Sequence, residues 1–71
     1  MRILIVEDEP DLLQSLAKVL REEGYAVDIA PDGEEGLYKV ESYPYDAIVL
    51  DVMLPKVDGW KLLEKIRKTR G

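Results

Sequence analysis

Two short apolar runs, each followed by acidic residues, constrain the fold of this chain more than any other feature. Residues 3–6 read Ile-Leu-Ile-Val and precede Glu7, Asp8 and Glu9, whereas residues 47–50 read Ala-Ile-Val-Leu and precede Asp51. Runs that are apolar at every position are typical of strands buried on both faces, as in a parallel sheet. If these two strands are neighbours, their carboxylates converge at one sheet edge, with the backbones roughly 5 Å apart.

Converging carboxylates repel one another unless a proton or a cation lies between them. Mg²⁺ prefers oxygen ligands, keeps several waters and typically binds one or two carboxylates together with phosphate oxygens. A carboxylate beside such a cation is a candidate nucleophile, because the metal screens it from the negative charge of its neighbours and of an anionic donor. The pattern therefore predicts a hard divalent metal at this edge and makes one Asp a candidate nucleophile.

Composition restricts the class of protein. A chain of 71 residues allows one small domain, which buries only about 60% of its unfolded surface and is marginally stable alone. The absence of cysteine and histidine excludes disulfides, thiolate or imidazole metal ligands and histidine bases. The net charge of −5 argues against a nucleic-acid surface. The first apolar run is too short for a signal peptide or a membrane span, so a cytoplasmic protein without a membrane partner is expected.

Predicted strands and helices alternate three times along the chain. The strands are expected at about 2–6, 25–30 and 46–50, and the helices at about 10–23, 33–42 and 59–69. Pro10 suits a first helical turn, Gly24 a left-handed helix end and Asp32 an N-cap. Tyr43 and Tyr45 are expected to cover the base of the sheet.

This alternation predicts an α/β fold with parallel strands joined by right-handed crossovers. The first and third strands are the most apolar, so the first is placed centrally, which gives the order 2-1-3 with the more polar second strand at an edge. The first two helices then lie on opposite faces. Open sheets of this kind bind ligands where the strand order reverses, at the carboxyl ends of the strands.

Both acidic motifs resemble a known family. Residues 3–9 and 48–59, the latter reading Ile-Val-Leu-Asp-Val-Met-Leu-Pro-Lys-Val-Asp-Gly, resemble the receiver domain of two-component response regulators. The second motif is most similar to regulators of the OmpR/PhoB type, which carry a DNA-binding winged helix after the receiver. The resemblance implies that residues 1–71 form a flavodoxin-like half-domain, (βα)3, the first three of five βα units.

The resemblance also implies a role for each site residue. Asp51 matches the residue that accepts a phosphoryl group from a sensor histidine kinase, so the domain would be a phosphoacceptor in signal transduction rather than an enzyme. Asp8 matches a direct Mg²⁺ ligand, and Glu7 matches a neighbour that reaches the metal through water. The backbone carbonyl of Met53 matches a further ligand. DNA binding would belong to an output domain outside this chain.

Residues that the family supplies from later strands are not in this sequence. Intact receivers carry a Ser or Thr after the fourth strand and a Lys after the fifth, so these 71 residues are not expected to switch on their own. The third strand would present an apolar edge, which recruits further strands. We therefore expect homo-oligomers through this edge, for example an antiparallel pair of third strands in the order 2-1-3-3′-1′-2′.

The same residues also allow other functions for the chain and purely structural roles for the acids. The chain could be an engineered or isolated structural half-domain whose only activity is self-association. It could also be a small Mg²⁺-dependent phosphatase, although such enzymes often have a second catalytic Asp where Met53 stands. Asp51 alone could be a turn residue. Glu7 and Asp8 could simply favour the positive end of the first helix.

Overall fold

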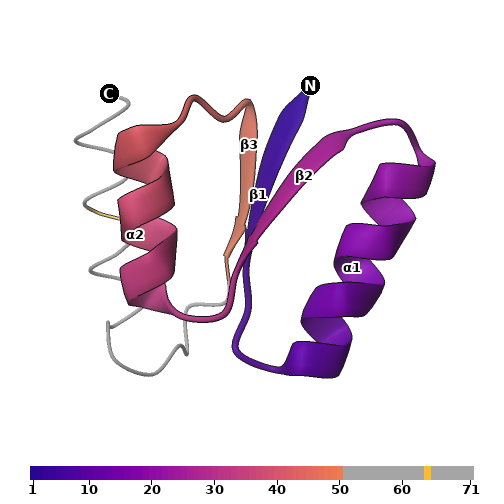
Figure 1. The fold of residues 1–71 in the computed structure, drawn as a ribbon, viewed down its shortest axis with the longest axis horizontal. Coiled ribbons are helices and arrows are strands. Elements are labelled where there is room, and N and C mark those ends of the chain that lie inside the picture. Colours follow the sequence, from indigo (N-terminus) through magenta and orange to yellow (C-terminus); the bar gives the residue numbers. More distant parts are fainter. Residues whose placement is uncertain (51–63, 65–71) are drawn as a thin grey trace.

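A computed structural model describes residues 1–50 and residue 64 as a three-stranded sheet with two helices (Figure 1). The elements are β1 (Arg2–Val6), α1 (Pro10–Glu22), β2 (Ala26–Ala30), α2 (Gly33–Ser42) and β3 (Ala47–Leu50). β2 and β3 each begin one residue later than the sequence predicts, and α1 ends one residue earlier. Offsets of this size are ordinary at element ends. The helix expected at about 59–69 lies outside the described residues, except for Glu64, which is helical and exposed.

The three strands lie in the order β2-β1-β3, and both pairs are parallel. The predicted order and the central place of β1 are therefore confirmed. The register of β1 against β3 runs from Ile3 opposite Ala47 to Val6 opposite Leu50. The carboxyl ends of these two strands thus lie at the same level of the sheet.

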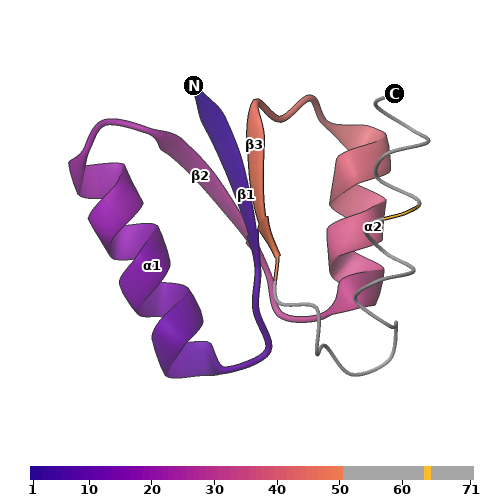
Figure 2. The same ribbon diagram turned by 180° about the vertical axis from the view of Figure 1, so that it is seen from behind.

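The two helices cover opposite faces of the sheet, as predicted (Figures 1 and 2). Successive side chains of a strand point to opposite faces, so β1 contributes to both cores, which explains why it is apolar throughout. The core on the α1 side contains Ile3, Ile5, Leu13, Ala17 and Val27. The core on the α2 side contains Leu4, Val6, Ala30, Val40 and Tyr45.

Gly24 ends α1 and turns the chain into β2. Its φ of 94° is left-handed, a conformation that favours glycine. Its N–H donates to the carbonyl of Arg21 at 3.0 Å, and the N–H of Tyr25 donates to that of Leu20 at 3.2 Å. These two bonds form a Schellman motif, so the sequence prediction for Gly24 is confirmed.

A capped and closely packed helix follows β2. The Asp32 carboxylate accepts a hydrogen bond from the N–H of Glu35 at 3.0 Å and caps α2, as predicted. One turn further on, a Cβ atom on Gly36 would lie 2.9 Å from Cγ2 of Val6. Gly36 therefore allows α2 to approach β1 more closely than a residue with a side chain would permit.

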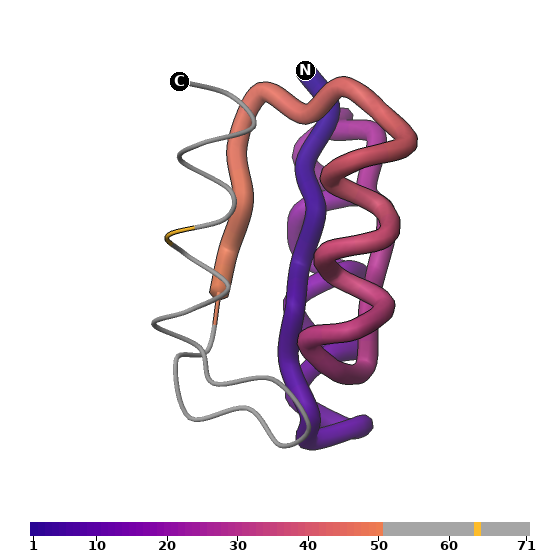
Figure 3. Tube along the Cα trace, turned by 90° about the vertical axis from the view of Figure 1, so that its left-hand side faces the viewer, coloured from indigo at the N-terminus to yellow at the C-terminus, as the bar shows by residue number. Residues whose placement is uncertain are grey.

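The two edges of the sheet differ. On β2, the Arg21 guanidinium donates to the carbonyl of Val27, and the Lys39 ammonium donates to that of Ile29. These cations, one from each helix, occupy outward-facing acceptors that another strand would need. Both helices pack against β1 and β2, and Figure 3 shows α2 over those strands rather than over β3.

Within the described part of the chain, no helix is long and apolar enough to span a membrane.

Candidate functional site

The two acidic motifs follow strands that are neighbours in the sheet, β1 and β3. Val6 and Leu50 are register partners at the ends of β1 and β3. Glu7 follows Val6 in the sequence, and Asp51 follows Leu50. The structure describes Glu7 and Asp8, whereas Asp51 and Met53 lie outside the described residues.

In the loop between β1 and α1, two of the three acidic side chains, those of Glu7 and Glu9, accept hydrogen bonds from backbone N–H groups. The N–H of Glu7 donates to the carbonyl of Ala30, which ties the end of β1 to β2. The Glu7 side chain accepts a hydrogen bond from the N–H of Glu9 at 3.0 Å. Glu9 in turn accepts one from the N–H of Asp11 at 2.9 Å and is the N-cap of α1. The loop is thus shaped by its own carboxylates.

Glu9 is the residue of this loop that sequence reasoning missed. An acid directly before Pro10 was the available signal, because proline favours the first helical position and a polar acceptor precedes it. Glutamate is not among the favoured N-cap residues, which concealed its role. The expectation that acids favour the start of α1 therefore applies most directly to Glu9.

Asp8 differs from its two neighbours, whose carboxylates each accept a hydrogen bond from a backbone N–H. Its side chain is exposed, and none of the described residues donates a hydrogen bond to its carboxylate. Mg²⁺ needs only one or two protein carboxylates because it keeps several waters, so Asp8 and Glu7 fit the oxygen donor set of such an ion. Among residues 1–50 and 64, no three potential ligand side chains lie close enough to hold a metal together.

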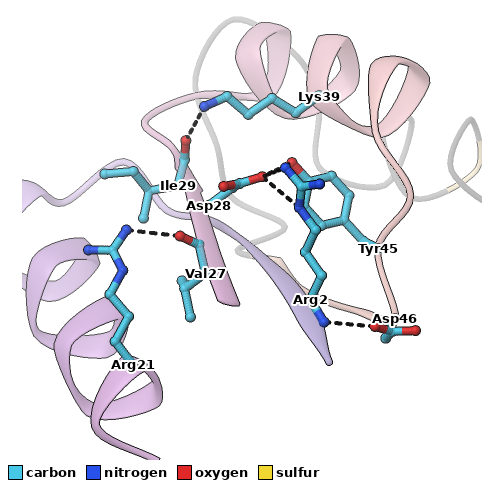
Figure 4. Close-up of polar contacts among 8 residues, drawn as sticks. All are labelled: Arg2, Arg21, Val27, Asp28, Ile29, Lys39, Tyr45 and Asp46. Atoms are coloured by element: carbon cyan, nitrogen blue, oxygen red, sulfur yellow. Dashed lines mark hydrogen bonds and ion pairs between the residues drawn. The ribbon is translucent and has the colours of Figure 1, made fainter. Parts of the chain in front are cut away.

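A second polar group, the amino-edge cluster, lies at the opposite end of the sheet and consists of Arg2, Asp28, Tyr45 and Asp46 (Figure 4). The Arg2 guanidinium donates to Asp28 Oδ2 at 2.8 Å, and the Tyr45 hydroxyl donates to the same oxygen at 2.6 Å. The guanidinium also lies 5.1 Å from the ring centre of Tyr43 and 5.4 Å from that of Tyr45. Asp46 joins the cluster through hydrogen bonds with the backbone of Arg2.

The amino-edge cluster changes the ionisation of its members. The Tyr45 hydroxyl, and after it the Arg2 guanidinium, lower the pKa of the Asp28 carboxyl, against the opposing effect of burial. Burial and the bond to Asp28 raise the pKa of the Tyr45 phenol above its ordinary range. Each partner therefore favours the charge state that the shared hydrogen bonds require: an ionised Asp28 and a neutral Tyr45.

Fold and site together define a doubly wound α/β domain of flavodoxin-like type with an acidic carboxyl edge. The family model for the response regulator receiver domain matches residues 3–71. The chain belongs to this family, and the predicted resemblance is confirmed.

Curated relatives are regulators of transcription. The chain is 53% identical over 71 residues to the transcriptional activator protein IrlR of Burkholderia pseudomallei, covering all of this chain and 31% of that protein. It is 47% identical over 70 residues to the transcriptional regulatory protein TcrA of Mycobacterium tuberculosis, covering 99% of this chain and 28% of that protein. The chain thus spans about a third of the length of these relatives.

Solved structures show the same fold. A receiver domain protein from Methanospirillum hungatei superposes with a TM-score of 0.95 at 43% identity, covering 97% of this chain and 55% of that one. The response regulator TrrA of Thermotoga maritima, in complex with Mg(2+)-BeF, gives 0.92 at 43% identity, covering 97% of this chain and 60% of that one. TrrA bound to the histidine kinase ThkA gives 0.87 at 45% identity, covering 94% of this chain and 58% of that one.

Proposed function

We propose that this chain is the phosphoacceptor part of a response regulator and that Asp51 takes a phosphoryl group from a sensor histidine kinase. One carboxylate oxygen would form a bond to phosphorus while the bond from phosphorus to the kinase histidine breaks. The observation that carries this proposal is the register of β1 against β3. Val6 lies opposite Leu50, and these two residues directly precede Glu7 and Asp51 in the sequence.

Mg²⁺ is the proposed cofactor, with Asp8 and Asp51 as direct ligands, the Met53 carbonyl as a third and Glu7 acting through water. Bound there, the ion would neutralise the charge of the carboxylates and of the incoming phosphoryl oxygens. The exposed carboxylate of Asp8 supports its role, because its neighbours Glu7 and Glu9 are engaged by backbone N–H groups. The complex of TrrA with Mg(2+)-BeF supports the same choice of metal.

The proposed partner is a histidine kinase, as for TrrA with ThkA. The proposed output is control of transcription through an OmpR/PhoB-type DNA-binding domain, and the names of the relatives IrlR and TcrA support the transcriptional part of this proposal. The regulator would be cytoplasmic. Family membership favours this function over a purely structural role.

The test is phosphorylation by acetyl phosphate with increasing Mg²⁺, followed by intact mass spectrometry. The wild-type chain should gain one phosphoryl group, and Asp51→Asn should gain none. Asp8→Asn should raise the Mg²⁺ concentration for half-maximal reaction at least about tenfold, the lower end of the effect of perturbing a metal site. Glu9→Gln is the matched control and should react like the wild type, because the amide retains the oxygen that caps Asp11. An adduct that persists in Asp51→Asn would contradict the assignment.

We also propose that the 71-residue chain self-associates through β3. Strand backbone groups alternate in direction, and the N–H of Asp46 points to Arg2 of β1, so those of Ala47 and Val49 point away from β1. None of the described residues bonds to these groups, whereas β2 carries the cations of Arg21 and Lys39 along its edge. Among the described residues, the edge left open is therefore that of β3.

A further inference from the structure

We infer that the amino-edge cluster of Arg2, Asp28, Tyr45 and Asp46 sets the register of β3 against β1. It thereby positions the acidic carboxyl edge, about 17 Å away along five strand residues. The register itself is independent of what the site does. Its consequence for phosphorylation rests on the proposed function.

The apolar sequence alone does not select this register. β1 and β3 are apolar at every paired position, from Ile3 opposite Ala47 to Val6 opposite Leu50. A slip of two residues returns each β3 side chain to its original face, since side chains alternate with a period of two. Such a slip would bury no polar residue within these runs, so hydrophobic patterning specifies the register only weakly.

The two described helices, α1 and α2, constrain β3 less than they constrain the other strands. β3 has only four residues, and both helices pack chiefly on β1 and β2. Ile48 and Leu50 pack against the core on the α2 side, but Val49, on the opposite face, remains 43% exposed. A short strand covered in this way needs other contacts to define its position.

Asp46 supplies two of those contacts at the entrance to β3. Its N–H donates to the carbonyl of Arg2 at 2.8 Å, and its Oδ2 accepts from the N–H of Arg2 at 2.7 Å. One residue therefore fixes both backbone groups of Arg2. A shift of β3 by two residues would break both bonds, because the partner atoms would move about 6.6 Å apart along the strand.

Tyr45 supplies the third contact and reaches across the central strand. β2 and β3 do not pair, yet the Tyr45 hydroxyl donates to Asp28 of β2 at 2.6 Å. Tyr45 is 1% exposed, so a slip would leave its hydroxyl without a partner in the core. An unmade hydrogen bond of a buried group costs more than a made one contributes. Polar groups in a core are known to select register for this reason.

This register determines where the acidic edge is assembled. Leu50, the residue before Asp51 in the sequence, lies opposite Val6, the residue before Glu7. A slip of two residues would displace Leu50 from this position by about 6.6 Å. Mg²⁺ holds its oxygen ligands at about 2 Å in near-octahedral geometry, so the displaced edge would not share one ion.

The register can be tested by NMR on the double variant Tyr45→Phe/Asp46→Ala. Wild-type protein should give one set of cross-strand contacts, including Val6 with Leu50. The double variant should give a second set for residues 47–50, displaced along β1. Lys18→Gly is the matched control, since it weakens α1 at an exposed site away from β3, and it should keep a single set. A single wild-type set in the folded double variant would overturn the inference.

If the double variant does not fold, each single variant is measured with sucrose added to favour the compact state. A single wild-type register in both would equally overturn the inference. Phosphorylation by acetyl phosphate gives a second readout. It should slow by at least about tenfold in the double variant, since small misplacements of reacting groups have effects of this size, and should be unchanged in Lys18→Gly. An unreactive wild-type chain contradicts the proposed function, whereas the NMR result still decides the register.

Discussion

Tyr45 illustrates, at the scale of single residues, how a buried side chain can carry a necessary polar atom. It is 1% exposed, and its hydroxyl donates to the ionised Asp28. Tyr45→Phe should lower the free energy of unfolding by about 1.5–3 kcal/mol, the range for hydrogen bonds to charged groups. Urea denaturation measures this loss. Tyr43→Phe is the matched control, because Tyr43 is exposed, and should change stability by less than about 0.5 kcal/mol. Equal effects of the two changes would contradict the role given to the hydroxyl.

The same cluster predicts a pH dependence. The Tyr45 hydroxyl and the Arg2 guanidinium lower the pKa of Asp28 in the folded state, so the unfolded chain takes up the proton first as the pH falls. The stabilisation is therefore complete above the unfolded pKa of about 3.9 and is lost as the pH falls through the folded pKa. The stability difference between wild type and Asp28→Asn should be largest at neutral pH and should shrink below about pH 4.

Urea denaturation across this pH range measures the dependence on Asp28. The comparison repeated in a Tyr45→Phe background should show a smaller change with pH, because the hydroxyl is the largest cause of the lowered pKa. A difference between wild type and Asp28→Asn that stays constant with pH would show that Asp28 does not titrate differently in the folded chain.

Single residues were predictable from sequence where their role is local. Gly24 and Asp32 act through backbone groups within three residues of themselves, so turn and cap preferences predicted them. Tyr45 and Asp28 were not predictable as partners, because they meet only after three strands have assembled. The roles of Asp51 and Met53 stay predictions, since both lie outside the described residues.

At the scale of elements, the contact of α2 with β1 depends on the lack of a side chain at Gly36. Gly36→Ala would improve helix propensity, but the new methyl group would lie 2.9 Å from Cγ2 of Val6, a stiff and fully buried side chain. Overpacking outweighs the propensity gain, so we expect a net loss of about 1–2 kcal/mol by thermal denaturation. Glu41→Ala, on the exposed side of α2, should stay within about 0.5 kcal/mol. A Gly36→Ala protein more stable than wild type would contradict this close approach.

The order of the elements followed from the sequence because hydrophobic pattern and connection rules point to the same arrangement. The fully apolar run of residues 3–6 required burial on both faces, which placed β1 at the centre. The register of β3 did not follow, because an apolar strand beside another apolar strand fits in several positions. The polar residues that flank the run, Tyr45 and Asp46, are needed to choose among them.

At the scale of the whole molecule, the two edges of the sheet differ in what the described residues place on them. The cations of Arg21 and Lys39 cover acceptors on β2, whereas Val49 on β3 is 43% exposed. A chain of 71 residues has a small core, so burying more surface by association would stabilise it. The 71-residue chain should therefore sediment as a dimer or larger oligomer at high micromolar concentration, where strand addition to the open edge is favoured.

Substitutions of two valines distinguish association through the edge of β3 from non-specific hydrophobic association. Val49→Lys places a charge on β3, a device that blunts strand edges, and should shift the 71-residue chain to monomers. Val19→Lys changes the same residue type on the outer side of α1, where Val19 is 57% exposed, and should leave association unchanged. If both variants dissociate equally, association is non-specific and does not use β3. If the wild-type chain is a folded monomer at high micromolar concentration, the edge of β3 is not an assembly site.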